Sequence, residues 1–575
     1  MSTNVSQTFA VHGQSGAWLP DRQLAERVSH HFGTPAFVYN ADYLRHNFDM
    51  LRQQLSPSID LLYSLKANPN AAIVDCLRAC GAGAEVSSRA ELHTAIRVGI
   101  DPANIIFVGP AKCRDEIADC IRFGIFAIVA ESAQELDEIQ RQAEASGVKR
   151  AVNVMLRVNP DFKTSGSGLT MSGKPRQFGI DVEQVPGLRG KLDTLALVRV
   201  IGFHVYMGTR YLEAEPVIEN TENILDMAER LARDLDIEIE AVDVGGGFGV
   251  PYFDNEEKLD LPKLARGVNA AVARFRKSNP ATRVMIELGR YLSAGAGALL
   301  TSVRYVKVSR GETFAIADGG TNLHMAAVGV GGFAKRSFPI VNLSRDRSGS
   351  DGVVTLTGPL CTPSDTMARK ADLGEVEEGD VIAVLCSGAY GPTASPTGFL
   401  SHGYPNEVLV DGDDLHLVRA ADSVSDIISA YRLPGDLPLP GDKSEFTIST
   451  RLSASDAHYG GGIVDGAHIL QLFGDAVTGL AALQDGDESL LQTWENVEFQ
   501  RPARPGDFLT VRARITRRKR LRRYVEVEAL RTVRAPDAAT STVIPVSPPE
   551  RIATAKGLIV VPMPNRQSKP EEVSQ

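Results

Sequence analysis

Between residues 37 and 287 the chain alternates short apolar runs with amphipathic stretches of helical periodicity, and this alternation constrains the fold most. The apolar runs read AFVY, DLLYSLKA, GAEVSS, IIFVGP, FAIVAES, VNVMLRVNP, VRVIGFHVY, EAVDVGGG and RVMIELG. Strands buried on both faces of a parallel sheet read as continuous apolar runs, and their alternation with helices indicates repeated strand–helix units. About eight units in roughly 250 residues predict a (β/α)8 barrel. A doubly wound open sheet is the alternative.

The helical rhythm stops after residue 290, where β-like runs separated by Gly, Asp and Asn predict a β-rich second domain. A Pro/Gly-rich segment then precedes one long helix candidate, 464–483, and four strand candidates. The expected order is an N-terminal segment joining the β-rich domain (1–34), a barrel (35–290), the β-rich domain (291–431), a linker (432–446), a third domain (447–563) and a disordered tail (564–575).

The composition is that of a globular protein, with 575 residues, 43% hydrophobic residues and a net charge of −10. The acidic balance argues against a nucleic-acid partner. No apolar run reaches the length of a membrane span and the polar start predicts no signal peptide, so we expect no membrane partner. Six scattered cysteines without a CxxC pair favour a reduced, cytoplasmic setting, and we expect no metal site.

Lys66, in YSLKANPN, ends one of the apolar runs. It is therefore expected at the C-terminal mouth of a barrel strand, the face where such barrels hold their catalytic residues. A partly desolvated lysine has a lowered pKa and can form a Schiff base with an aldehyde. A surface lysine that closes a strand is the alternative.

Three more segments carry groups that suit a phosphorylated ring compound. Glycines 245–247, in VDVGGGFG, follow a strand and let backbone N–H groups approach a phosphate, although the spacing is neither GxGxxG nor a Walker loop. ELGR places Glu287 and Arg290 at another strand end, where a carboxylate can pair with a protonated ring nitrogen and a guanidinium can hold a phosphate. An ordinary salt bridge is the alternative. GPLCTPSD and SGAYG put a cysteine and a tyrosine in loops of the second domain.

Together these motifs, from about residue 37 to 418, resemble the fold type III pyridoxal-phosphate (PLP) decarboxylases, the group of diaminopimelate and ornithine decarboxylases. The resemblance implies an alanine racemase-like barrel and β-domain, PLP as cofactor and a homodimer with shared active sites. It implies that Lys66 binds PLP covalently, that Glu287 binds its ring nitrogen, and that Cys361 of the partner subunit protonates the carbanion. The other PLP contacts that it implies are Gly245, Gly246, Gly247, Gly289, Arg290 and Tyr390.

Two departures from the family pattern concern the ring and the substrate. GFHVYMGT puts Tyr206 where the family stacks a histidine on the pyridoxal ring, and Thr209 where it has a serine, with His204 two residues earlier. An aromatic tyrosine can still stack. Thr362 follows Cys361, whereas diamine-forming members have an acid there that binds the distal amine. Lysine, ornithine and diaminopimelate are therefore less favoured substrates.

ADGGTNLHMAAVG, GPLCTPSD and SGAYGPTASPTGFLSH resemble more closely a subgroup that decarboxylates amino acids tethered as thioesters to an acyl carrier protein. A neutral Thr362 suits a distal carboxyl that is already a thioester. His204, Asp365, His324 and His402 are further candidates for substrate contacts. A structural role is the alternative for each histidine.

The third domain resembles a hotdog fold, with one long helix wrapped by an antiparallel sheet. Its DAHYGGGIVDGAHILQLFGD stretch more closely resembles 3-aminobutyryl-CoA ammonia-lyase, which makes His458, Asp465 and Asp475 acid–base candidates. A carboxylate at a helix start is also an ordinary cap, and a thioesterase is an alternative activity. The basic run TRRKRLRRY, 516–524, is either a solvated turn or a contact for coenzyme A phosphates or an acidic carrier protein.

These resemblances lead to one expected reaction sequence. PLP-dependent decarboxylation would act on an aspartyl- or glutamyl-type amino acid, tethered through its side-chain carboxyl to coenzyme A or an acyl carrier protein. For an aspartyl-type substrate the product is a β-aminoacyl thioester, from which the hotdog domain would eliminate ammonia to give an acrylyl-type thioester, or in reverse add an amine to that thioester. The alternatives are a decarboxylase of a free amino acid such as diaminopimelate or ornithine with a hotdog domain for assembly only, an amino-acid racemase, and a non-catalytic PLP-binding protein.

Overall fold

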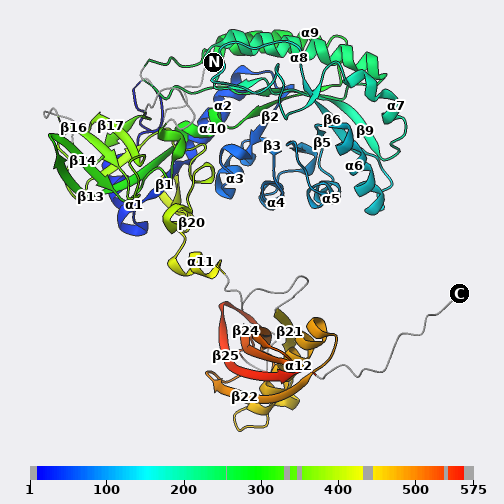
Figure 1. The fold of residues 1–575 in the computed structure, drawn as a ribbon, viewed down its shortest axis with the longest axis vertical. Coiled ribbons are helices and arrows are strands. Elements are labelled where there is room, and N and C mark those ends of the chain that lie inside the picture. Colours follow the sequence, from blue (N-terminus) through cyan, green and yellow to red (C-terminus); the bar gives the residue numbers. More distant parts are fainter. Residues whose placement is uncertain are drawn as a thin grey trace. The chain divides into compact units, whose positions relative to one another are not determined.

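The computed structural model describes residues 9–13, 15–253, 255–328, 337–345, 352–431, 445–536 and 542–561. These residues belong to two compact units, which divide between residues 424 and 425 and are drawn as ribbons in Figure 1. The predicted linker at 432–446 lies mostly outside the described residues, and the predicted tail at 564–575 lies wholly outside them.

The first unit contains a closed barrel of eight parallel strands, which confirms the predicted barrel and excludes the open sheet. Its strands pair in the order β2-β3-β4-β5-β6-β9-β11-β12, and β12 pairs with β2 to close it. The strands are β2 (Ile59–Ser64), β3 (Gly83–Val86), β4 (Ile105–Phe107), β5 (Ala127–Ala130), β6 (Val152–Asn159), β9 (Val198–His204), β11 (Ala241–Gly246) and β12 (Arg283–Leu288).

Helices alternate with the barrel strands along the chain, as the sequence pattern predicts. They are α2 (Ala41–Gln54), α3 (Ala71–Ala79), α4 (Arg89–Arg97), α5 (Arg114–Phe123), α6 (Ala133–Ala145), α7 (Arg189–Leu192), α8 (Ala214–Leu235), α9 (Leu261–Phe275) and α10 (Arg290–Ser293). Each longer helix packs an apolar stripe against the strands, which leaves the loops at the strand ends to form the site. Three short strands, β7 (Leu169–Thr170), β8 (Ile180–Asp181) and β10 (Gly208–Thr209), lie in these loops.

The apolar run at 36–40 is not a barrel strand, which corrects the sequence prediction. This strand, β1 (Ala36–Asn40), pairs antiparallel with β13 (Gly297–Ser309) and parallel with β19 (Asn406–Asp411) in the β-rich domain. All five of its residues are buried. A strand at the centre of any covered sheet reads as a continuous apolar run, so the run alone could not assign β1 to one sheet or the other.

The β-rich domain is a nine-stranded sheet, as expected for the second domain. Besides β1, β13 and β19 it contains β14 (Glu312–Ala317), β15 (Ile340–Asn342), β16 (Val353–Thr357), β17 (Thr366–Asp372), β18 (Val381–Val384) and β20 (Asp414–Arg419). The described part of the N-terminal segment includes α1 (Arg22–Phe32) and contacts this domain. The Thr34 hydroxyl donates to Asp318, and the Asn406 amide donates to the Phe32 carbonyl.

The second unit begins with α11 (Val424–Ser429) at its boundary and contains the predicted hotdog fold. Its five strands pair in the order β21-β23-β24-β25-β22. The strands are β21 (Glu445–Arg451), β22 (Leu490–Phe499), β23 (Phe508–Lys519), β24 (Arg522–Arg534) and β25 (Ile544–Val560). The sheet packs on α12 (Gly466–Asp485), whose Phe473, Ala476 and Leu480 are fully buried. Helix α12 is long and apolar enough to cross a membrane, by length and composition alone.

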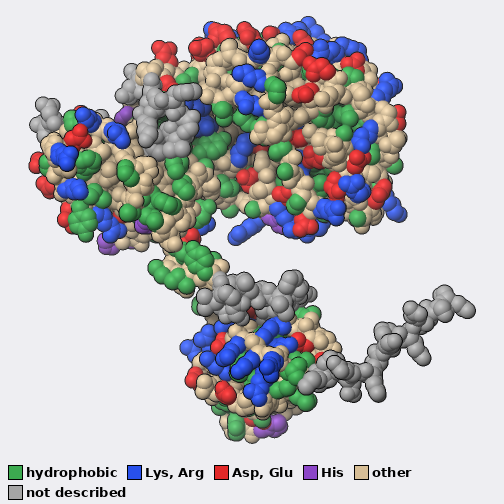
Figure 2. Space-filling view, in the orientation of Figure 1, with side chains coloured by type: hydrophobic (Ala, Val, Ile, Leu, Met, Phe, Trp, Pro, Cys, Tyr) green, Lys and Arg blue, Asp and Glu red, His purple; other side chains and the backbone are tan. Residues whose placement is uncertain are grey.

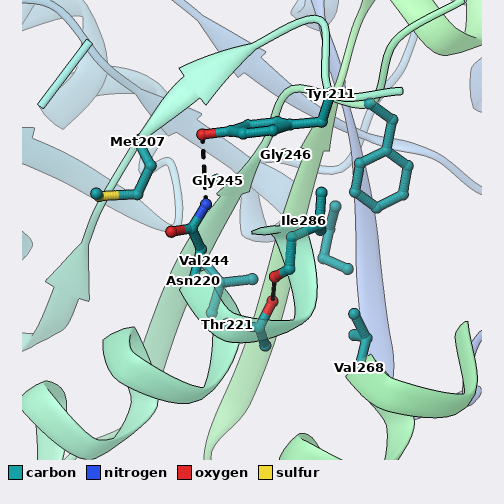
Figure 3. Close-up of a pocket in the computed structure, with 11 residues that line it drawn as sticks. Met207, Tyr211, Asn220, Thr221, Val244, Gly245, Gly246, Val268 and Ile286 are labelled. Carbon is teal, nitrogen blue, oxygen red and sulfur yellow. Dashed lines mark hydrogen bonds between the residues drawn. The ribbon is translucent and has the colours of Figure 1, made fainter. Parts of the chain in front are cut away.

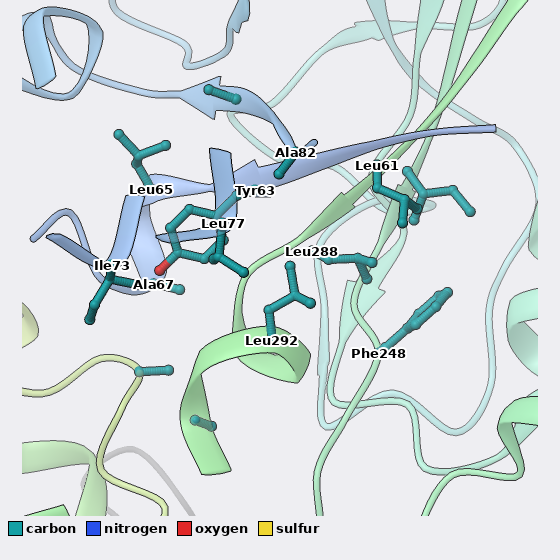
Figure 4. Close-up of a cluster of buried hydrophobic side chains, with 14 of the residues drawn as sticks. Leu61, Tyr63, Leu65, Ala67, Ile73, Leu77, Ala82, Phe248, Leu288 and Leu292 are labelled. Carbon is teal, nitrogen blue, oxygen red and sulfur yellow. The ribbon is translucent and has the colours of Figure 1, made fainter. Parts of the chain in front are cut away.

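The turn that carries Lys66 rests on a dense part of the core. Leu65 and Ala67 flank the lysine in a short 3-10 turn (Leu65–Ala67) after β2, and both are fully buried. Figure 4 shows them beside Tyr63, Ile73 and Leu77, with Leu288 and Leu292 nearby. Because its two neighbours are fixed in the core, the Lys66 side chain is presented from a rigid backbone.

Candidate active site

Lys66 lies at the carboxyl end of β2, as predicted, beside two buried carboxylates. Its Nζ is 3.0 Å from Glu85 Oε2 and 3.9 Å from Glu287 Oε2, and about a third of the lysine side chain, 34%, is exposed. Glu85 is on the adjacent strand β3, and Glu287 is on β12 at the other side of β2. Barrel closure therefore places a carboxylate on each side of the amine.

These carboxylates reverse the shift in the pKa of Lys66 that the sequence predicts. The sequence predicts a lowered pKa from desolvation, and burial indeed acts in that direction, but the attraction of Glu85 and then Glu287 outweighs it and holds the pKa of Lys66 well above its ordinary value. The amine is therefore a charged ammonium before it reacts.

Glu287 belongs to a buried cluster under the lysine. His204 Nε2 donates to Glu287 Oε1 at 3.0 Å, and the ligand atoms of His204, Asp243 and Glu287 lie within 4.8 Å of one another. Burial raises the pKa of Glu287, but the attraction of His204 and Lys66 dominates and keeps it well below its ordinary value. Burial and the charge of Glu287 raise the pKa of Asp243. The cluster thus holds one ionised carboxylate, Glu287, facing the lysine.

The glycine run forms a turn that only glycine fits. A Cβ on Gly246 would lie 1.8 Å from the Glu287 carbonyl oxygen, and one on Gly247, whose φ is +78°, would lie 2.1 Å from the Gly208 carbonyl oxygen. Gly245 also has positive φ, and its N–H donates to Asp243 Oδ1 at 2.7 Å. Figure 3 shows Gly245 and Gly246 lining a small buried pocket in which the Asn220 amide donates to the Tyr211 hydroxyl.

Arg290 begins α10 directly after Gly289, where a Cβ would meet that of Ala67 at 2.7 Å. The guanidinium donates to the Tyr252 hydroxyl at 2.8 Å and lies over the Tyr390 ring at 4.5 Å. The N–H of Tyr390 in turn donates to the Ala67 carbonyl at 2.7 Å. The structure thus brings Arg290 and Tyr390 to the Lys66 turn, as the predicted phosphate contacts require.

Tyr206 follows β9 and faces the lysine. Lys66 Nζ lies 5.1 Å from the centre of its ring, and burial raises the pKa of Tyr206 to about 12, so the phenol stays neutral. Thr209 lies in β10, three residues on. The predicted stacking residue therefore reaches the same site as Lys66 and Glu287.

The residues present fit PLP by their unused polar atoms. Glu287 Oε2 and Arg290 Nε are buried, and among the described residues neither has a hydrogen-bond partner. An ionised carboxylate that lacks a donor suits a protonated ring nitrogen, and a buried guanidinium beside a glycine turn suits a phosphate. The Lys66 amine lies 3.9 Å from Glu287 Oε2, and Tyr390, whose ring faces Arg290, donates to the carbonyl of the neighbouring Ala67.

The loop with Cys361 is held by Asp365. Cys361 is exposed, and within the described residues no hydrogen bond or ion pair links it to the Lys66 cluster. The Thr362 hydroxyl is 2.9 Å from that of Ser364. Asp365 is buried, and it accepts hydrogen bonds from the Thr321 and Leu360 N–H groups, each at 2.7 Å. Asp365 therefore fixes the loop, which differs from the substrate contact expected from the sequence.

The three candidate substrate histidines are placed differently from one another. His204 is fully buried under Glu287, so the structure gives it a positioning contact instead of the expected contact with substrate. His324 is fully buried between Phe37 and Phe338, with ring centres 5.8 and 5.4 Å away. His402 is exposed in a loop.

In the hotdog unit two of the predicted acid–base residues, His458 and Asp465, are in contact. His458 Nδ1 is 2.7 Å from Asp465 Oδ2, while Asp465 Oδ1 accepts from the His468 N–H at the start of α12. These hydrogen bonds lower the pKa of Asp465. Asp465 thus both caps the helix and contacts His458, whereas Asp475 is exposed further along α12.

The basic run at 516–524 spans the turn between β23 and β24. Figure 2 shows Lys and Arg side chains gathered on one face of this unit. Within the run, Arg523 forms a salt bridge with Asp485 at 2.7 Å, and Arg518 donates a hydrogen bond to the side chain of Gln484. Lys519, Arg520 and Arg522 are exposed.

Sequence reasoning missed three residues of the site, Glu85, Asp243 and Tyr252. Glu85 and Asp243 each interrupt an apolar run near the end of a strand, in GAEVSS and VDVGGG, and both are fully buried. A carboxylate in a run that is otherwise apolar was the available signal, because burying a charge is costly without a partner. Tyr252 gave no comparable signal.

The barrel, the lysine between two carboxylates and the β-rich second domain define a pyridoxal-dependent decarboxylase. The chain matches the family "Pyridoxal-dependent decarboxylase, pyridoxal binding domain" over residues 42–294. The chain belongs to this family, as a fold type III enzyme that uses PLP. Residues 461–534 match the thioesterase superfamily, which agrees with the hotdog fold. The ammonia-lyase activity expected from the sequence stays a prediction.

Among similar proteins is the L-glutamyl-[BtrI acyl-carrier protein] decarboxylase of Niallia circulans. It is 36% identical over 413 residues, 71% of this chain and 96% of the relative. The diaminopimelate decarboxylase of Pseudomonas aeruginosa is 32% identical, over 71% of this chain and 95% of the relative. The crystal structure of diaminopimelate decarboxylase from M. jannaschii with L-lysine has a TM-score of 0.66 and 28% identity, covering 74% of this chain and 98% of that one.

Proposed function

We propose that this decarboxylase acts on an α-amino acid of the aspartyl or glutamyl type whose side-chain carboxyl is a thioester on an acyl carrier protein or coenzyme A. One feature of the structure favours this substrate class over a diamine precursor. In the loop 358–366 Thr362 is neutral, and Asp365, the loop's acid, is buried with its oxygens bonded to Thr321 and Leu360. The loop therefore offers no carboxylate to bind the distal ammonium of a diamine. The similarity to a decarboxylase named for a carrier-bound glutamyl group supports the proposal.

When bound, PLP supplies the electron sink for loss of the α-carboxyl. The Lys66 amine would hold the cofactor, the Glu287 carboxylate would bind the proton on its ring nitrogen, and His204 would keep Glu287 ionised and oriented. The glycine turn and Arg290 would bind the phosphate. The Tyr206 ring would lie on the cofactor ring, and Cys361 Sγ of the partner subunit would deliver a proton to the substrate's α-carbon.

The proposal is tested by CO2 release from the PLP-loaded protein. Free aspartate, glutamate and diaminopimelate are compared with the pantetheine thioesters of the aspartyl and glutamyl side chains, with Lys66→Ala as the inactive control. We expect CO2 from a thioester at least a hundredfold faster than from any free acid. Faster release from diaminopimelate or another free amino acid would overturn the proposal and leave the hotdog unit an assembly role.

We also propose that the hotdog unit acts on the decarboxylated thioester, with the His458–Asp465 pair transferring the proton. With the aspartyl-type product, a β-aminoacyl thioester, mass analysis distinguishes ammonia elimination, which leaves an unsaturated thioester, from hydrolysis, which releases a free acid and a free thiol. His458→Ala is expected to stop the second step while CO2 release continues, and Glu488→Gln, at an exposed position after α12, is the control. A thioester product that persists unchanged in the wild type would contradict this second activity.

We further propose a homodimer, because the proton donor Cys361 is exposed and has no contact with Lys66 in the described chain. Mixing Lys66→Ala protein with Cys361→Ala protein tests the sharing of sites between subunits. We expect the mixture to regain up to about a quarter of the wild-type activity, since one of the two sites in a mixed dimer is intact. No recovery after subunit exchange, verified by sedimentation, would contradict a shared site.

A further inference from the structure

A loop between β6 and β8 pairs with residues 206–209, the segment that follows β9 and includes Tyr206. We call residues 161–178 of this loop the mouth flap. Its strand β7 pairs antiparallel with β10, so that Leu169 lies opposite Thr209. Two further bonds continue this pairing, from the Met171 N–H to the Met207 carbonyl at 2.9 Å and from the Ser172 hydroxyl to the Tyr206 carbonyl at 2.9 Å. The flap is thus fixed directly beside a residue of the active site.

The base of the mouth flap is anchored by buried side chains. Asn159 at the end of β6 accepts from the Gly173 N–H at 2.9 Å and donates to the Lys174 carbonyl at 3.1 Å. The Thr164 hydroxyl lies 3.0 Å from the Tyr211 hydroxyl and accepts from the Asn220 amide at 2.9 Å. These bonds use the polar groups at the base, and of the outer basic side chains Arg176 donates to the Thr170 carbonyl at 3.3 Å.

The outer surface of the flap is basic. Lys163, Lys174 and Arg176 are exposed, and no ion pair holds any of them among the residues that the structure describes. The flap has one acid, Asp161, although the whole chain has a net charge of −10. By contrast, Arg210 beside the flap is paired with Glu256 at 2.7 Å. An unpaired basic cluster next to the mouth of an acidic protein suits an acidic partner.

Leu169 adds an apolar contact to this surface, since 58% of it is exposed at the tip of the flap. An exposed apolar side chain among basic ones is the usual composition of a small docking surface, with the charges steering the encounter and the apolar group adding affinity.

We propose that the mouth flap is the docking surface for the acidic carrier protein that presents the thioester substrate. This inference rests on the proposed function and names the partner of the same site. Lys163, Lys174 and Arg176 would meet carboxylates of the carrier, Leu169 would contact its apolar surface, and the tethered amino acid would pass beside Tyr206 toward Lys66.

The test compares one acyl group on two supports, the acidic acyl carrier protein and free pantetheine. The triple variant Lys163→Glu/Lys174→Glu/Arg176→Glu is expected to raise KM for the carrier-bound substrate at least tenfold, with kcat within twofold of wild type. Both constants for the pantetheine thioester should stay within twofold. For the wild type, KM for the carrier-bound substrate should rise with salt, because screening weakens exposed charge pairs.

The matched control is Lys519→Glu/Arg520→Glu/Arg522→Glu, which makes the same change of charge in the hotdog unit. If this variant raises KM for the carrier and the flap variant does not, the docking surface is the hotdog hairpin and the inference is wrong. Unchanged KM in the flap variant also overturns it. If the triple variant loses the visible absorbance of lysine-bound PLP, its active site is disrupted and its KM is not informative. The inference is then tested by the KM of Lys174→Glu alone and by the salt dependence of the wild-type KM for the carrier-bound substrate.

Failure of the docking inference is distinguishable from failure of the proposed function. If the wild type releases CO2 from neither thioester, the proposed function fails and the docking inference fails with it. If it uses the pantetheine thioester but not the carrier-bound one, the thioester chemistry stands and the docking inference alone is overturned.

Discussion

At the scale of single residues, Lys66, the proposed cofactor-binding lysine, is held charged until it reacts. Glu85 lies 3.0 Å from its Nζ and Glu287 lies 3.9 Å away, and their attraction raises the pKa of Lys66 against the effect of burial. Only the neutral amine attacks an aldehyde. Cofactor binding by the apoenzyme therefore requires the amine to lose its proton first, and the attraction of the two carboxylates opposes that loss.

Glu85→Gln is expected to lower the pKa of Lys66, because the nearer of two attracting carboxylates is removed. The fraction of neutral amine at a given pH then rises, and the rate of PLP binding to the apoenzyme should increase several-fold near pH 7. Stopped-flow absorbance measures the PLP-binding rate at each pH, and the rate profile of the variant should be shifted toward lower pH. Asp115→Asn, on the exposed surface of α5, is the control and should leave the profile unchanged. A profile shifted toward higher pH would refute the assignment.

His324 links acidity to stability. Burial between Phe37 and Phe338 lowers the pKa of His324 from 6.5 to about 3, so the folded protein keeps this ring neutral while the unfolded chain protonates it below pH 6.5. Stability is lost as the pH falls from 6.5 toward 3, by about 1.4 kcal/mol per pH unit. His324→Phe removes this dependence. The Tm of the variant minus that of the wild type should therefore rise as the pH is lowered from 6.5 to 4.5. A constant difference would mean that His324 titrates normally in the folded protein.

At the scale of elements, the glycine turn after β11 sets how closely two barrel strands approach. Gly246 lies against the Glu287 carbonyl of β12, where a Cβ would be 1.8 Å from the oxygen. The turn and Glu287, the proposed partner of the ring nitrogen, are therefore one unit, since any displacement of β11 moves Glu287 as well.

Gly246→Ala is expected to push β12 away, destabilise the fold by roughly 1–3 kcal/mol or more, and weaken PLP binding at least tenfold. Tm and absorbance titration with PLP measure the two effects. Gly187→Ala is the matched control, because a Cβ there has nothing within 4 Å. Equal behaviour of the two variants would show that the turn has more room than its geometry indicates.

The Lys66 turn is also tied to the β-rich domain. Asn68 donates to the Gly388 carbonyl at 3.1 Å, and Asn70 donates to Glu407 on β19 at 3.0 Å. Glu407 also accepts from the Tyr39 hydroxyl on β1 at 2.8 Å, and burial raises its pKa. This network explains how the second domain can position a lysine that belongs to the barrel.

Glu407→Ala leaves two buried donors without an acceptor and should cost about 1–3 kcal/mol of stability. The loosened turn should also broaden and weaken the visible absorbance of lysine-bound PLP. Glu407→Gln keeps an acceptor oxygen, and we expect it to restore the absorbance and most of the Tm. If Glu407→Ala lowers Tm but leaves the absorbance and the PLP affinity intact, Glu407 has a structural role only.

At the scale of the whole molecule, the two units have separate hydrophobic cores. The first unit has a core that spans the barrel and the β-rich domain, with a smaller cluster among the barrel strands, and the second unit has a core built from α12 and the hotdog sheet. The carboxylates, the lysine and the glycine turn all belong to the first unit. Decarboxylation should therefore depend on the first core and not on the second.

A chain ending at residue 431 is expected to fold, bind PLP and release CO2 at a rate within threefold of the full chain. Calorimetry of the full chain should show two transitions, and PLP should raise only the one that belongs to the first unit, because a ligand stabilises the part that binds it. A single transition, or loss of PLP binding on truncation, would show that the units fold as one.

Most of the barrel and the chemical groups of its site can be predicted from local sequence patterns. Each barrel strand is apolar over several residues and each helix is amphipathic, so the eight strand–helix units are encoded locally. Lys66, Glu287, Arg290 and the glycines at 245–247 could be predicted for the same reason, since each lies where a local pattern ends.

Which groups meet depends on long-range packing. The fold places β1 in the second sheet, Glu85 beside Lys66, His204 on Glu287 and Asp365 inside its loop. These contacts join residues that are 19 to 83 positions apart, or, for β1 and β19, in distant parts of the chain. The contacts of Glu85 and His204 arise because closing the barrel fixes the neighbours of every barrel strand, and those of β1 and Asp365 arise from pairing and packing in the second sheet, neither of which local periodicity specifies. The charge of the lysine is consequently a property of the closed barrel.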